Sequence, residues 1–179
     1  MLKKLLHYVR GYVKTSVLTP IVVMAEVVLE VFIPLYMSRI IDVGIPNADL
    51  PYVLKMGGVM VLMALGALLF GALGARLAVY SSNGAAKNLR LALFDKIESF
   101  SFKNTDKFST ASLVTRLTND ITNVQQSFQM MIRLLARSPL MLILATVFAV
   151  RISPELSVII LLAIPILGGA MAFISKLAF

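Results

Sequence analysis

The chain has 179 residues, of which 59% are hydrophobic and 15% charged, and its mean hydropathy is +0.88. This composition excludes intrinsic disorder, and it holds more apolar residues than a soluble domain of this length can bury. The formal net charge is +8, but long apolar runs separate the basic residues, which argues against a nucleic acid as partner. Cysteine is absent, so neither disulfides nor thiolate metal sites are expected. The composition predicts a membrane protein.

Four apolar stretches predict four transmembrane helices, each about as long as the hydrocarbon core requires. In chain order, the predicted spans cover residues 16–43, 54–80, 128–150 and 155–176. Only short, turn-rich linkers separate the first span from the second and the third from the fourth, so each pair is expected to form a hairpin. Because an isolated sheet edge is not stable in lipid, all spans are expected to be helices. The predicted fold class is an all-α membrane protein.

Residues 81–127, between the second and third spans, are charged but keep a helical pattern. One apolar face consists of Leu89, Leu93, Ile97 and Phe100, which recur at i, i+4, i+8 and i+11. A second face has the same kind of spacing and consists of Leu113, Leu117, Ile121 and Val124. These faces predict that the second and third spans extend as long helices into the cytoplasm. Basic residues here and in residues 1–15 predict a cytoplasmic N-terminus.

Two acidic and two basic residues lie inside predicted spans, where ions need partners. Counted from the outer ends of their spans, Glu30 and Arg137 lie 12 and 13 residues deep. Glu26 and Arg133 lie 16 and 17 residues deep. These matching depths predict that the four side chains face one polar cavity, as direct pairs or across water, and make it the candidate substrate cavity. Two interpretations stay open: ion pairs that stabilise the bundle, or acids that attract cationic, amphipathic substrates.

The run Ser99-Phe100-Ser101-Phe102 and residues 106–120, which end in Arg-Leu-Thr-Asn-Asp, resemble the first intracellular loop of ABC exporters of the six-helix type. Residues 39–45, Arg-Ile-Ile-Asp-Val-Gly-Ile, are also similar to that family. Ala111 stands where the family more often has glycine, a change common in heterodimeric multidrug exporters. The resemblance implies a partial type 1 ABC exporter transmembrane domain, which corresponds to helices one to four of six in a longer protein.

The resemblance also implies a coupling helix at the tip, at residues 102–108, seated in a cleft of the nucleotide-binding domains. Phe102 and Phe108 would be its apolar anchors. Its contact residues would be Phe102, Lys103, Asn104, Thr105, Asp106, Lys107 and Phe108.

Residues 1–179 contain no Gly-x-x-x-x-Gly-Lys-Ser/Thr phosphate loop, so this chain holds no ATP site and we expect no cofactor in it. ATP and Mg are implied for a nucleotide-binding domain, which would make the full-length protein an ATPase-coupled translocase. The implied function is ATP-driven export of multidrug, lipid or peptide substrates across the cell membrane. The implied partners are the lipid bilayer, nucleotide-binding domains, a second transporter half (identical or different) and a small amphipathic substrate. The alternatives are a secondary transporter or channel that uses the Glu and Arg pairs, or a membrane scaffold module.

Overall fold

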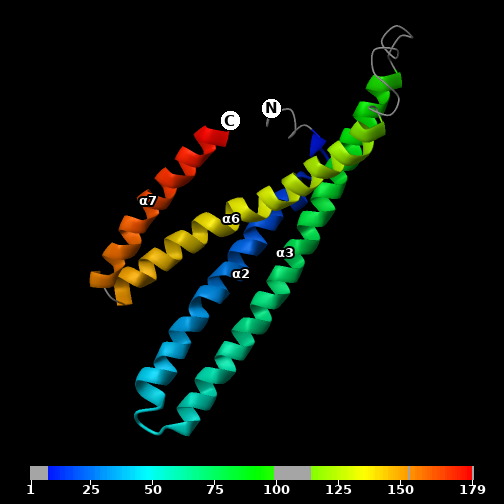
Figure 1. The fold of residues 1–179 in the computed structure, drawn as a ribbon. Helices are drawn as coiled ribbons and strands as arrows, with labels where there is room; N and C mark the ends of the chain where they lie inside the picture. The colour runs from blue at the N-terminus through cyan, green and yellow to red at the C-terminus, as the bar shows by residue number, and fades with distance from the viewer. Residues whose placement is uncertain (1–7, 99–113, 153, 179) are drawn as a thin grey trace. The chain divides into compact units, whose positions relative to one another are not determined.

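The computed structural model describes residues 8–98, 114–152 and 154–178, which are helical almost throughout. None of these residues lies in a β-strand, so the prediction of an all-α protein is confirmed. The elements are α2 (Val13–Arg39), η1 (a π-helix, Ile40–Gly44), α3 (Leu50–Glu98), η2 (a π-helix, Arg116–Asp120), α6 (Ile121–Ile152) and α7 (Pro154–Ala178). Figure 1 shows these helices in chain order.

The chain divides into two compact units, Met1–Arg137 and Ser138–Phe179. The first unit contains α2, α3 and the N-terminal half of α6. The second contains the rest of α6 and α7, which begins at Pro154. Proline suits this place because it lacks a backbone N–H, and the N–H of the first helical residue has no acceptor within the helix.

Within the first unit, α2 and α3 form an antiparallel hairpin closed by a short turn (Figure 1). Asp49 caps α3, since its Oδ1 accepts a hydrogen bond of 3.0 Å from the backbone N–H of Tyr52. Gly44 ends the π-helix η1 close to α3, where a Cβ would lie 2.7 Å from Val53 Cγ2. The short linker predicted between the first two spans is confirmed.

Small residues bring the two helices of this hairpin together. On α3, the buried positions include Ala67, Gly74, Ala78 and Ser81. A Cβ added at Gly74 would lie only 3.1 Å from Val23 Cγ2 of α2, so the missing side chain is what permits this approach. Without a hydrophobic driving force between helices in lipid, such close backbone packing is a main source of association.

Polar contacts extend this packing toward the N-terminus of α2. The Ser81 hydroxyl donates to Thr15 Oγ1 at 2.8 Å, and the Thr15 hydroxyl donates to the Tyr12 carbonyl at 2.9 Å. About two turns further along α3, the Asn88 side-chain amide donates to the carbonyls of Tyr8 and Arg10 at 2.8 and 3.0 Å. The segment before α2 is therefore tied to α3. We call the whole contact from Tyr8 to Leu29 on one side and Gly66 to Asn88 on the other the α2–α3 seam.

The charged end of α3 continues as one helix to Glu98, as predicted for an extension of the second span. Its predicted apolar face is half-buried at Leu89, Leu93 and Ile97, whereas the charged residues between them are exposed. On the third long helix, Ile121 is buried, as its face predicted. Phe100, the last residue of the first face, and Leu113, the first residue of the second, lie outside the described residues.

Three helices are long and apolar enough to cross a membrane, Val13–Gly44, Leu50–Glu98 and Arg116–Ile152. They contain the first three predicted spans. The predicted fourth span coincides with α7, in which Leu162–Lys176 forms a shorter apolar stretch. A fourth crossing therefore stays a prediction.

Candidate functional site

An ion trio of Glu26, Glu30 and Arg137 joins α2 to α6 inside the apolar region. Arg137 Nη1 donates to Glu26 Oε1 at 2.8 Å, and Arg137 Nη2 donates to Glu30 Oε2 at 2.7 Å. The two acids are four residues apart and therefore share one face of α2. The planar guanidinium spreads its donors as a fork, so one arginine can hold both carboxylates. The structure therefore pairs three of the four predicted residues directly, and their role in a substrate cavity stays a prediction.

Glu26 is the most buried member of the ion trio, with 8% of its surface exposed. Its second carboxylate oxygen, Oε2, is buried and has no hydrogen-bond partner among the described residues. The carboxylate lies against α3 at Gly71, where a Cβ would stand 3.0 Å from Glu26 Oε1. A side chain at position 71 would therefore push the carboxylate off α3. Gly71 belongs to the small-residue face of the seam, and it also makes room for this ion.

Arg133, the fourth predicted residue, lies one turn before Arg137 on the same face of α6. Its predicted depth in the membrane is close to that of Glu26, but in the structure both Glu26 and Glu30 form ion pairs with Arg137. In the part of the chain that the structure describes, Arg133 makes no ion pair or hydrogen bond. It does line a hollow together with Glu26 and Glu30, whereas Arg137 lines a second hollow together with Arg133.

Two open hollows meet at Arg133. The first has a volume of about 460 Å³ and combines the charged groups with apolar residues of α2 and α3, including Ile33 and Leu68. The second, of about 370 Å³, is lined by Gln129, Met130, Arg133, Leu134 and Arg137, all on α6. No acidic residue lines the second hollow. Pockets of 300–1,000 Å³ with apolar walls and a few polar groups are typical of small-molecule sites.

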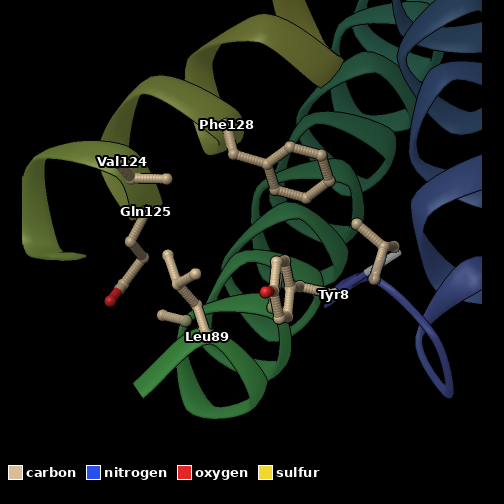
Figure 2. Close-up of a pocket in the computed structure, with 8 residues that line it drawn as sticks. Tyr8, Leu89, Val124, Gln125 and Phe128 are labelled. Atoms are coloured by element: carbon tan, nitrogen blue, oxygen red, sulfur yellow. The ribbon is translucent and has the colours of Figure 1, made fainter. Parts of the chain in front are cut away.

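A third, much smaller cavity lies where the segment before α2 meets α3 and α6. Figure 2 shows Tyr8, Leu89, Val124 and Phe128 turned toward this space. Its volume of about 10 Å³ leaves room for about one water molecule, so it is a packing junction rather than a ligand site. Here the two predicted apolar faces meet, since Leu89 belongs to the first and Val124 to the second. No pattern in the sequence predicted that Tyr8 would line this junction.

A side-chain hydrogen bond adds to the same junction. The Gln125 amide on α6 donates to Asn83 Oδ1 on α3 at 2.5 Å. Arg90 Nε also donates to the backbone carbonyl of Leu117, in the π-helix η2, at 3.3 Å. These contacts tie α3 to the third long helix beyond the apolar part of each. The predicted contact residues of the tip, 102–108, lie outside the described residues, as does Ala111.

The model of the ABC transporter transmembrane region matches residues 17–178. The chain belongs to this family. It is also 34% identical, over 93% of its length, to YfiB of Bacillus subtilis (strain 168), an uncharacterised ABC transporter ATP-binding protein.

Two further relatives carry functional names. The ABC-type oligopeptide transporter ABCB9 of Mus musculus is 28% identical over 93% of this chain. The ATP-dependent lipid A-core flippase of Pseudoalteromonas translucida (strain TAC 125) is 25% identical over 97% of it. The chain spans only 29% of YfiB, 22% of ABCB9 and 30% of the flippase.

Together, the family and the three long apolar helices make the chain a multi-pass membrane protein. Its fold is the transmembrane region of an ABC transporter. The resemblance seen in the sequence is thereby confirmed at the level of the family.

Proposed function

We propose that the chain forms part of the membrane domain of an ATP-driven exporter, in which α3 and α6 act as levers. The length of α3 carries this proposal. Its 49 residues correspond to about 73 Å, more than twice the ~30 Å of the hydrocarbon core. A helix of this length must project far beyond the membrane on one side. The projecting end is the charged one, which contains Lys87, Arg90 and Lys96.

In this proposal the protein lies in the cell membrane, and the basic end of α3 and the basic N-terminal residues lie in the cytoplasm, as the excess of Lys and Arg in cytoplasmic loops supports. Nucleotide-binding domains, on the same or another polypeptide, would bind the coupling helix at residues 102–108. ATP with Mg, held by those domains, would supply the driving free energy. A second transporter half, identical or different, would complete the cavity, and the relatives' names support a lipid or peptide among the small amphipathic substrates.

The contacts between α3 and α6 explain how a displacement at the tip reaches the membrane. Gln125 holds Asn83 across the junction, and Leu89 and Val124 border the same small cavity. Both helices would therefore move together when the nucleotide-binding domains close. Because a helix resists compression along its axis, motion at one end appears at the other.

The ion trio has a structural role in this proposal. Arg137 already occupies one oxygen of each acid, which favours the interpretation of Glu26 and Glu30 as part of a tie between α2 and α6. The hollows at Arg133 would then form the part of the substrate cavity that this chain contributes.

The test is a proline at Leu93, in the projecting part of α3. The full-length transporter, reconstituted in liposomes, should hydrolyse ATP and move an amphipathic probe in an ATP-dependent way. Leu93→Pro removes a helical hydrogen bond and breaks the lever, at a cost of about 3 kcal/mol. We expect this variant to keep ATP hydrolysis but to lose at least 90% of transport.

Leu93→Ala is the matched control, because it trims the same side chain but leaves the helix intact, and it should retain transport. Normal coupling in Leu93→Pro would contradict the lever. Transport driven by a proton gradient without ATP would instead support a secondary transporter.

A further inference from the structure

We propose that Arg133 binds the anionic group of an amphiphile that the transporter carries. The site is the second hollow, lined by Gln129, Met130, Arg133, Leu134 and Arg137. This inference rests on the proposed function, because it assigns a substrate class to the same membrane cavity.

The ion pairs of the neighbouring residues point to Arg133. Arg137 gives its two terminal nitrogens to Glu26 and Glu30, and each acid thereby has a counter-ion. Arg133 has none among residues 8–98, 114–152 and 154–178. A guanidinium in the apolar part of a membrane is costly unless an anion or a polar group pairs with it. An anion that arrives with the substrate meets this need.

The lining of the second hollow has the chemistry of an anion site. It contains two arginines and one amide, Gln129, and no acidic residue. The two acids face the first hollow, on the α2 side, where Arg137 holds them. An anionic group that approaches from the second hollow therefore meets donors before it meets a carboxylate. Phosphate and carboxylate groups match the guanidinium fork, which can bind either with two parallel hydrogen bonds.

The rest of the lining accepts an apolar tail. Met130 and Leu134 lie beside Arg133 and are 62% and 55% exposed. Methionine adapts to irregular apolar shapes, which suits a flexible chain. The volume of about 370 Å³ holds a head group with a short part of such a chain. An anionic head on an apolar tail is therefore the chemistry that fits.

A different occupant would behave differently. An acidic side chain from another helix of the assembled transporter could also pair with Arg133. In that case the arginine would support the fold, and its loss would affect every substrate alike. The experiment must therefore compare substrates that share one apolar chain and carry head groups of different charge.

The full-length transporter is reconstituted in phosphatidylcholine liposomes, which supply no net anionic lipid. Three probes share one oleoyl chain: lysophosphatidic acid is anionic, monooleoylglycerol is neutral and oleoylcholine is cationic. The concentration of each probe that half-maximally stimulates ATP hydrolysis is measured for the wild type and for Arg133→Gln. ATP-dependent transfer of radiolabelled lysophosphatidic acid across the bilayer is measured in parallel.

We expect the wild type to respond to lysophosphatidic acid at about a tenth of the concentration needed for the neutral probe. Arg133→Gln should raise that concentration about tenfold for the anionic probe only, the size expected for one lost charge-assisted contact. Arg133→Lys should restore part of the effect, because it keeps the charge but loses the fork. Arg151→Gln, which removes an exposed cation at the other end of α6, should match the wild type.

Equal effects of Arg133→Gln on all three probes would overturn the inference, and so would stimulation by lysophosphatidic acid without its transfer. Neither result touches the proposed function, which is tested separately by the ATP-dependent transport of an amphipathic probe and by Leu93→Pro. If Arg133→Gln does not accumulate in membranes, the ranking of the three probes by the wild type and by Arg133→Lys still decides. A wild type that prefers the cationic or neutral probe contradicts an anion site.

Discussion

Gly84 lies near one end of the α2–α3 seam, where the absence of a side chain allows a close contact. The Tyr12 ring lies directly against this glycine, so that a Cβ would overlap three of the ring carbons. The ring cannot simply turn away, because it also meets the ring of Tyr80 edge-on with centroids 5.4 Å apart. Aromatic pairs of this geometry contribute about 0.5–1.5 kcal/mol beyond the area that they bury. Gly84 is therefore required by contact and not by backbone flexibility.

Gly84→Ala should consequently destabilise the protein. Alanine favours a helix interior by nearly 1 kcal/mol over glycine, but overpacking costs about 1–3 kcal/mol, so the net effect is a loss. Thermal unfolding of the purified transporter would show a lower midpoint. Gly58→Ala is the control, since nothing lies within 4 Å of its Cβ, and it should be neutral or stabilising. Equal midpoints for the two variants would contradict the role of the Tyr12 contact.

At the scale of the elements, Arg137 is the tie that fixes α6 against α2. Its side chain is 36% exposed, whereas that of Glu26 is 10% exposed, so the acid depends on the arginine more than the reverse. Loss of one partner leaves a buried charge without compensation, which is far more costly than loss of the whole set. The order of stability among variants can therefore distinguish a tie from an incidental contact.

Arg137→Gln should lower the free energy of unfolding by about 3 kcal/mol, near the lower end for broken buried pairs. Adding Glu26→Gln and Glu30→Gln to the same protein should recover much of this loss, because the uncompensated charge disappears. Unfolding of the three proteins in lipid nanodiscs would be compared. A triple variant less stable than Arg137→Gln alone would count against an ion trio.

The elements were largely predictable from the sequence, because their apolar periods are long and their linkers are rich in turn residues. Leu93 and Ile121 illustrate this, since a spacing of four residues placed both on faces that the structure buries at least in part. The depths of the charged residues followed from counting residues along a helix of fixed rise. The pairing of both acids with Arg137 instead of Arg133 could not be predicted in this way, because counting gives the depth of a residue but not the direction in which a long side chain extends.

Contacts between distant positions were the other part that the sequence did not reveal. Asn88 binds the carbonyls of Tyr8 and Arg10, and no periodicity marks an asparagine for that task. The two π-helices, η1 and η2, were likewise not predicted. A π-helical turn contains about one residue more than an α-helical turn, and no particular residue type marks it in the sequence. Such details depend on how the helices pack against each other in three dimensions.

For the whole molecule, the decisive property is which side of the membrane each end of the long helices faces. The α2–α3 turn lies at one end of the hairpin, and the charged part of α3 lies at the other. The proposed orientation places the turn outside and the charged part in the cytoplasm. The chain contains no cysteine, so a single introduced thiol reports its own location.

We expect Ile45→Cys, at an exposed turn position, to react with a membrane-impermeant maleimide on intact cells. Lys87→Cys, also exposed, should react only after the membrane is permeabilised. Any cysteines elsewhere in the transporter are first replaced by serine. The opposite labelling pattern would reverse the orientation and with it the place of the nucleotide-binding domains.

The α2–α3 seam also has a mechanical consequence. Two rods that are bonded side by side along their length bend much less than either rod alone, because bending would require them to slide past each other. Contacts at Gly84, Gly74 and Gly66 recur along the hairpin and oppose such sliding. The hairpin should thus travel as one stiff beam during a transport cycle, and the joints of the cycle should lie at its ends.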